Sequence, residues 1–79
     1  MARTVKMPKF GLSMETGTIG TWMKQVGDSV TEGDALLEVE TDKITNTVEA
    51  PTNGTLKEIY ASEGQEVAVG EALCMIDES

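Results

Sequence analysis

The sequence contains no histidine and only one cysteine, Cys74. The lack of histidine removes the usual general base of enzymes, and with it the Ser–His and Cys–His nucleophile pairs. One cysteine cannot form an internal disulfide bond, and the chain has no set of cysteines and histidines for zinc. We therefore expect neither an enzyme in its own right nor a metal site.

Basic residues are scarce: six lysines and arginines stand against fourteen acidic residues, which gives a net charge of −8. This balance argues against binding to nucleic acid or to an anionic membrane. The apolar runs are too short to cross a bilayer, and the first residues lead into strand-like sequence instead of a signal region. With 79 residues, the chain is expected to be one small cytoplasmic domain of marginal stability.

Short apolar stretches separated by glycines predict an all-β fold, and no window shows the 3.6-residue period of a helix. In the strand that precedes the middle of the chain, alternation predicts that Leu37 and Val39 point inward. In the returning strand, Ile44, Val48 and Ala50 share one phase. The expected strands cover 4–7, 17–24, 29–31, 35–41, 44–50, 56–60, 66–68 and 72–76.

The second half of the chain repeats the first. A shift of 37 residues places 17–40 on 54–77 without a gap. It aligns three pairs of glycines, at 17 and 54, 27 and 64, and 33 and 70, and we expect each to mark a turn with an unusual φ. Apolar residues three apart, at 19 and 22 and at 56 and 59, predict a bulge in each strand. Two like halves within one domain, 1–79, imply quasi-twofold symmetry.

One segment has no counterpart in the repeat. The first half carries six extra residues between Pro8 and Gly17. Its three large apolar side chains could cover one end of the core, or the loop could touch a partner; the asymmetry favours recognition. The segment consists of Lys9, Phe10, Gly11, Leu12, Ser13, Met14 and Glu15.

The central hairpin is the other unmatched feature. Its residues are Glu40, Thr41, Asp42, Lys43 and Ile44. A turn between the flanking strands places Lys43 at the tip, exposed and remote from both termini. Taken alone, it is an ordinary solvated lysine. Elsewhere, Trp22 and Cys74 are expected to serve packing in the core.

The two gap-free half-repeats and the central Glu40-Thr41-Asp42-Lys43-Ile44 motif resemble a lipoyl domain over essentially the whole chain. Gly27 and Gly54, which flank the lysine at 16 and 11 residues, belong to the same pattern. The opening segment from Met7 to Met14 most resembles the dihydrolipoamide acyltransferase component of 2-oxo acid or acetoin dehydrogenase complexes. The resemblance implies a flattened barrel of two four-stranded antiparallel sheets, with lipoic acid in amide linkage on Lys43. It assigns the other motif residues and the two glycines to presentation or recognition of the hairpin.

The resemblance also implies partners for a monomeric carrier. A lipoylating enzyme would attach the cofactor, and a thiamine-diphosphate decarboxylase would reductively acylate it. An acyltransferase domain would pass the acyl group to coenzyme A, and the flavoprotein dihydrolipoamide dehydrogenase would reoxidise the dithiol. The chain is then an excised domain or a very small carrier.

Three alternatives have different sequence signatures. Biotinyl domains share the fold but typically have methionine on both sides of the lysine, where this chain has Asp42 and Ile44. The carrier of the glycine-cleavage system is normally longer and has helices. An unmodified structural domain of the same fold is the third alternative.

Overall fold

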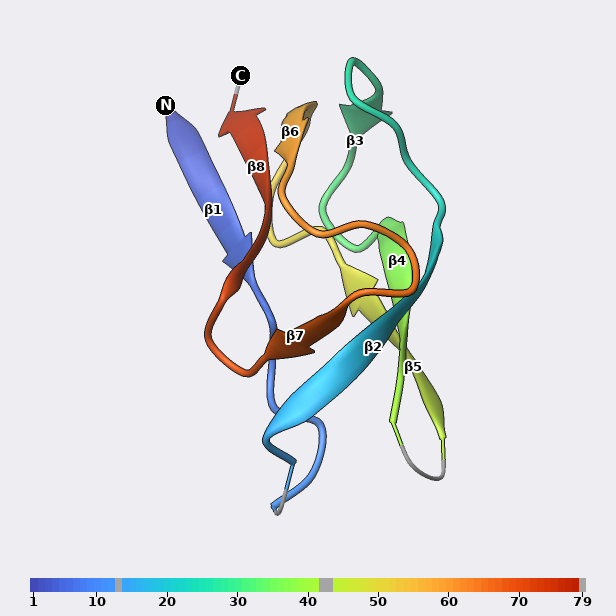
Figure 1. Cartoon of the computed structure of the whole chain (residues 1–79). Helices are drawn as coiled ribbons and strands as arrows, with labels where there is room; N and C mark the ends of the chain where they lie inside the picture. The colour runs from blue at the N-terminus through green and yellow to red at the C-terminus, as the bar shows by residue number, and fades with distance from the viewer. Residues whose placement is uncertain (13, 42–43, 79) are drawn as a thin grey trace.

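The computed structural model describes residues 1–12, 14–41 and 44–78, so Ser13, Asp42, Lys43 and Ser79 lie outside the described residues. The described part contains eight strands and no helix (Figure 1). In chain order they are β1 (Ala2–Lys6), β2 (Thr16–Trp22), β3 (Ser29–Val30), β4 (Ala35–Glu40), β5 (Thr45–Glu49), β6 (Gly54–Ile59), β7 (Glu66–Ala68) and β8 (Ala72–Glu78). Among the described segments, no helix is long and apolar enough to cross a membrane.

The strands form two antiparallel sheets with the orders β1-β8-β6-β3 and β5-β4-β2-β7. This confirms the prediction of two four-stranded sheets, and the sheets remain two layers instead of closing into one continuous barrel. Their inner faces bury a single apolar core. The completely buried side chains at its centre are Leu36, Leu37, Val39, Leu56, Leu73, Cys74 and Ile76.

The two sheets are related by quasi-twofold symmetry. β1, β8, β6 and β3 occupy the same places in one sheet as β5, β4, β2 and β7 in the other. Hydrogen bonds between the halves follow the same relation: Gly27 N donates to Leu56 O at 2.8 Å, and Gly64 N donates to Ile19 O at 2.7 Å. The exact extent of the halves, 17–40 and 54–77, remains our proposal.

Two of the three glycine pairs lie in turns, as predicted. Their φ values are +98° and +87° for Gly27 and Gly64, and +93° and +92° for Gly33 and Gly70. In the turn that contains Gly33, the Asp34 carboxylate accepts a hydrogen bond from the Thr31 amide at 2.9 Å. Its counterpart in the other half is Glu71, which accepts from the Ala68 amide at 3.1 Å.

The prediction of a turn at Gly17 and Gly54 was wrong, because both glycines lie inside strands. Their lack of a side chain serves close packing instead. A Cβ on Gly17 would lie 2.6 Å from Val39 Cγ1, and a Cβ on Gly54 would overlap the carbonyl oxygen of Asp77. The two positions are therefore glycine for a steric reason.

Two irregularities of the strands agree with the sequence-based predictions, and two other features of the strands differ from them. The pairing register shifts between Ile19 and Trp22 and again between Leu56 and Glu58, which confirms the predicted bulges. A further shift after Ala35 buries Leu36 beside the predicted Leu37 and Val39. Ile44 does not continue the inward phase of β5: it is 56% exposed, because β5 begins only at Thr45.

Trp22 and Cys74 both pack in the core, as expected. The half-buried Trp22 donates from its indole Nε1 to the Ala61 carbonyl oxygen at 2.8 Å. Cys74 is fully buried, and burial raises the pKa of its thiol to about 11.

This pKa shift predicts alkaline sensitivity. Below about pH 9 the thiol is neutral in both the folded and the unfolded chain, so the free energy of unfolding is unaffected. Above that pH the unfolded chain releases the proton first, so stability should fall by about 1.4 kcal/mol between pH 7 and pH 10. Urea unfolding at pH 7 and pH 10 gives the loss in the free energy of unfolding between the two pH values. The loss is compared between the protein and Cys74→Ala, and it should be larger for the protein. An equal loss of stability in the two proteins would contradict the assignment to Cys74.

Candidate functional site

The hairpin between β4 and β5 is closed by the two described residues nearest its tip. Thr41 N donates to the Ile44 carbonyl oxygen at 2.9 Å, and Thr41 Oγ1 donates to the same oxygen at 3.1 Å. Glu40 pairs with Thr45 just below. Asp42 and Lys43, which connect Thr41 to Ile44 in the sequence, lie outside the described residues.

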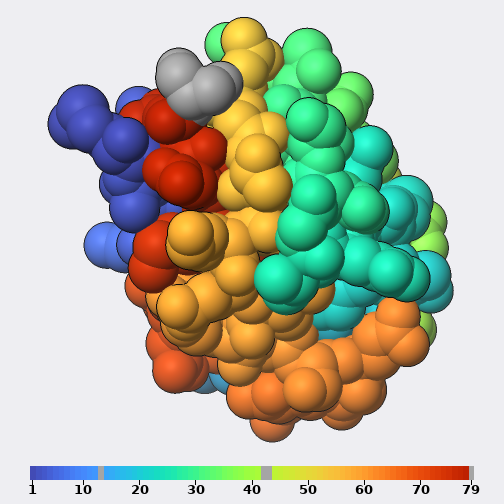
Figure 2. All heavy atoms as spheres, turned by 90° about the horizontal axis from the view of Figure 1, so that it is seen from above, coloured from blue at the N-terminus to red at the C-terminus, as the bar shows by residue number. Residues whose placement is uncertain are grey.

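The hairpin end of the molecule is opposite to the termini. Pairing of Ala2 with Asp77 brings the first and last strands together. Figure 1 shows both termini at one end and the β4–β5 hairpin at the other, along a molecule whose longest dimension is 35 Å. Figure 2, viewed onto the terminal end, shows the N-terminal segment against the C-terminal strand. The hairpin is therefore remote from both ends of the chain.

The described part of the loop 9–15 has apolar side chains that are packed against the core and one that is exposed. Phe10 and Met14 are half-buried and pack against the core, whereas Leu12 is 97% exposed. The Phe10 amide donates to Met14 Sδ at 3.2 Å, and the Met14 amide donates to the Gly11 carbonyl oxygen at 3.1 Å. These bonds fold the described part of the loop so that two apolar side chains face inward and one faces solvent.

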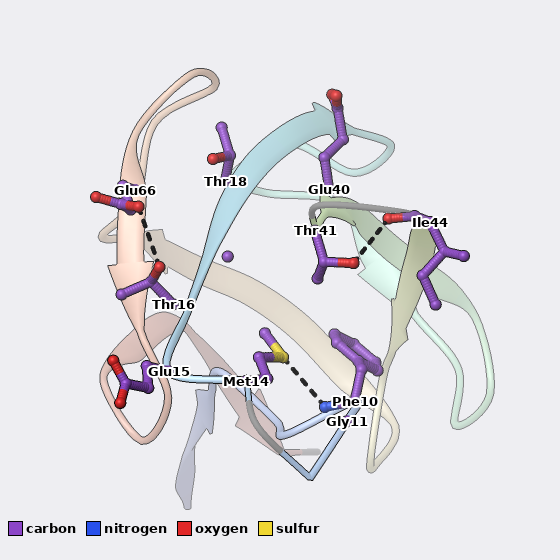
Figure 3. A pocket seen from close by; sticks show the side chains of 11 residues that line it. Phe10, Gly11, Met14, Glu15, Thr16, Thr18, Glu40, Thr41, Ile44 and Glu66 are labelled. Carbon is purple, nitrogen blue, oxygen red and sulfur yellow. Dashed lines mark hydrogen bonds between the residues drawn. The ribbon is translucent and has the colours of Figure 1, made fainter.

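The loop and the hairpin lie side by side, and a groove runs between them (Figure 3). The sequence offered them as two separate features, and the tertiary structure joins them. Residues from the loop, from β2, from the hairpin and from β7 line the groove. They are Phe10, Gly11, Met14, Glu15, Thr16, Gly17, Thr18, Glu40, Thr41, Ile44 and Glu66.

Thr16, Thr18 and Glu66 are groove residues that sequence reasoning missed. Thr16 Oγ1 donates to Glu66 Oε2 at 3.0 Å, and Thr18 pairs with Glu66 between β2 and β7. No motif marks them: Thr18 and Glu66 were placed only in predicted strands, and Thr16 lay one residue before the predicted strand 17–24, whereas β2 begins at Thr16. Together with Glu15 and Glu40, Glu66 gives the groove an acidic rim. In the part of the chain that is described, no three metal-ligating side chains come together.

Gly27 and Gly54 are not brought to the hairpin. Gly27 occupies the turn after β2, and Gly54 pairs with Glu78 near the C-terminus. Neither lines the groove. These glycines can therefore contribute to the hairpin only indirectly, by stabilising the fold of the domain.

Comparison with known proteins gives a consistent result. The family described as "Biotin-requiring enzyme" matches residues 3–76. The chain is 45% identical, over 95% of its length, to the dihydrolipoyllysine-residue acetyltransferase component of the acetoin cleaving system of Pseudomonas putida. It covers 20% of that protein, so the chain spans about a fifth of the curated relative.

Two solved structures show that the fold alone does not distinguish a lipoyl domain from a domain of a carboxylase. The lipoyl domain of the 2-oxoglutarate dehydrogenase complex from Azotobacter vinelandii has a TM-score of 0.78 and 36% identity, with 95% of each chain covered. Urea carboxylase from Kluyveromyces lactis has a TM-score of 0.82 and 25% identity, with 98% of this chain and 6% of that one covered. The backbone is thus common to both, and the higher sequence identity lies with the former.

Proposed function

Because this chain belongs to the biotin/lipoyl family, and within it is a lipoyl domain, we propose that Lys43 is the residue that carries lipoic acid. Lipoyl domains are carrier domains that hold lipoic acid covalently on a lysine. The observation that carries the assignment is the closure of the hairpin by Thr41 and Ile44. Of the two residues that connect them, only Lys43 has an amine.

The other lysines have different surroundings. Lys6 and Lys57 belong to β1 and β6, among paired strands. Lys24 follows the end of β2, although the sequence predicted a strand there, and its Nζ lies 3.8 Å from Asp34 Oδ2. Lys9 is on the loop and is exposed. None of these four sits in the turn of a closed hairpin.

The chain's own residues would supply position while the cofactor supplies the chemistry. Amide formation at Lys43 removes one positive charge, which takes the net charge from −8 to −9. When attached, the lipoyl group would supply a disulfide that can accept an acyl group and two electrons. Glu40, Thr41, Asp42 and Ile44 would present the lysine to the lipoylating enzyme.

The finer assignment is a carrier within a dihydrolipoamide acyltransferase of a cytoplasmic 2-oxo acid or acetoin dehydrogenase complex. Support comes from the similarity to the acetoin-system component and to the 2-oxoglutarate dehydrogenase lipoyl domain. The domain would then serve a thiamine-diphosphate decarboxylase, an acyltransferase domain and dihydrolipoamide dehydrogenase. Tethering would make each visit effectively intramolecular, at local concentrations on the order of mM.

Intact mass after modification tests this function. The domain is expressed with a lipoate ligase and, separately, with a biotin ligase. A lipoyl adduct in the first sample and none in the second is the expected result. A biotin adduct without a lipoyl adduct would establish the biotinyl alternative instead. That alternative is less supported, since the lower identity is to the carboxylase and methionine does not flank Lys43.

The hydroxyl of Thr41 should help to present the lysine. Thr41→Val removes the bond from Oγ1 to Ile44 O and retains the β-branched shape. We expect a loss of about 1 kcal/mol of stability and lipoylation slowed about threefold to tenfold, because displacing a reacting group by about 1 Å weakens productive approach. Thr41→Ser is the matched control and should retain both values. Lipoylation of the Thr41→Val protein at the parent rate would contradict a positioning role.

A further inference from the structure

We infer that the groove between the loop 9–15 and the β4–β5 hairpin is a resting site for the lipoyl group of the same domain. This inference rests on the proposed lipoylation of Lys43. Ile44, the next residue in the chain, lines the groove. Because Lys43 is bonded to Ile44, an arm attached at Lys43 would be anchored one residue along the chain from the groove lining.

Three of the residues that line the groove, Phe10, Met14 and Ile44, have large apolar side chains. Figure 3 shows the Phe10 ring and the Met14 side chain close together on the loop, and the Ile44 side chain on the hairpin where β5 begins. Ile44 is 56% exposed, and Phe10 and Met14 are only partly buried, so each retains apolar surface open to solvent. A flexible hydrocarbon chain that ends in a dithiolane would remove this surface from water.

Contacts within the loop hold the side chains that line the groove in place. The bond from the Phe10 amide to Met14 Sδ, at 3.2 Å, connects the two loop side chains that line it. Gly17 forms part of the floor, where a Cβ would lie 3.1 Å from Met14 Cε. A side chain at position 17 would therefore displace Met14. Because the contact between Phe10 and Met14 already orders them, an arm that enters the groove bears little of the cost of ordering these two residues.

Charge selects the kind of occupant. Carboxylates of Glu15, Glu40 and Glu66 surround the groove and disfavour phosphates or acidic peptides. The lysine amide and the dithiolane are neutral, so the modified arm meets no such repulsion. An unmodified ammonium would instead be drawn towards the rim carboxylates.

The asymmetry of the two halves is consistent with this role. Phe10 and Met14 both belong to the extra residues of the first half, and the equivalent connection in the second half, 51–53, is short and lacks both. Quasi-twofold symmetry therefore does not require them. Their position beside the one hairpin that carries the lysine gives the extra residues a function within the domain itself.

The test uses the lipoylated domain, with modification verified by intact mass. Nuclear Overhauser contacts from the lipoyl methylenes to the Phe10 ring and the Met14 methyl group are the first readout. The second is the rate at which a neutral phosphine, tris(3-hydroxypropyl)phosphine, reduces the dithiolane to the dithiol. We expect contacts to both residues, and reduction about threefold slower than for free lipoamide, which corresponds to an arm that rests in the groove about two thirds of the time.

Two variants and one control locate the effect. Phe10→Ala should remove the contacts and restore the rate of free lipoamide. Ile44→Ser, at an exposed position where folding is not at risk, should do the same. Leu12→Ser, on the same loop but not lining the groove, should leave both readouts unchanged.

Absence of these contacts in the parent, with reduction as fast as for free lipoamide, would overturn the inference. So would contacts at the groove that arise only with an added decarboxylase, since the occupant would then be a segment of the partner. Failure of lipoylation, seen by mass before either measurement, would instead refute the proposed function.

Discussion

Lys43→Arg should yield a folded domain that takes up no lipoate at all. Arginine keeps the charge, so the free energy of unfolding should change by no more than about 0.5 kcal/mol. Its guanidinium is effectively always protonated and cannot be acylated in place of an amine. The expected change in modification is therefore complete, whereas the expected change in stability is close to zero.

The remaining lysines should not substitute for Lys43. Lys57, the control position, lies in β6 with its Nζ 4.0 Å from Asp77 Oδ2. Lys57→Arg should be lipoylated at the parent rate. Intact mass, peptide mapping and a thermal midpoint for each protein make the comparison. Lipoate on Lys6, Lys9, Lys24 or Lys57 of the Lys43→Arg protein would refute the assignment.

Leu12→Ser should slow reductive acylation of the lipoylated domain about tenfold in kcat/KM while leaving lipoylation itself unchanged. Leu12 is 97% exposed on the loop beside the hairpin, so it does not hold the fold together. Truncation of an apolar anchor at a protein interface commonly costs more than about 1 kcal/mol, and a tenfold change corresponds to about 1.4 kcal/mol. We propose that the decarboxylase recognises the loop 9–15, and the predicted effect follows from that contact.

The structure favours this single substitution over shortening the loop. A shortened loop would also remove Phe10 and Met14 from the edge of the core, and lost stability would confuse the result. Val26→Ser is a suitable control, because Val26 is another exposed aliphatic residue, 59% accessible, on the connection between β2 and β3. Equal kcat/KM values for the Leu12→Ser protein, the Val26→Ser protein and the parent would show that the loop does not contribute to recognition.

Local patterns predicted most of the strand arrangement. Glycines that need a positive φ mark turns wherever they occur, so the pairs at 27 and 64 and at 33 and 70 were correctly interpreted. Alternation identified Leu37 and Val39, because a strand with one buried face repeats every two residues. The repeat predicted quasi-twofold symmetry, and the resemblance to lipoyl domains implied the two four-stranded sheets that the structure contains.

Errors arose where a residue's role depends on a distant neighbour. Gly17 and Gly54 look like turn glycines, yet they are required by Val39 and Asp77 from other strands. Leu36 is buried because the pairing of β4 with β5 shifts register, and Ile44 is exposed because β5 begins one residue later. These features depend on how two strands meet, and that cannot be deduced from the periodicity of either strand.

The central motif, the glycine turns and the extra loop could all be predicted from the sequence, because each depends on residues that are adjacent in the chain. The groove could not. It exists because β2 and β4 pair antiparallel, which brings the loop before β2 to the same end of the sheet as the hairpin after β4. Thr16, Thr18 and Glu66 join it through the pairing of β2 with β7. Which side chains surround the lysine's hairpin is therefore a property of strand pairing, to which residues far apart in the chain contribute equally.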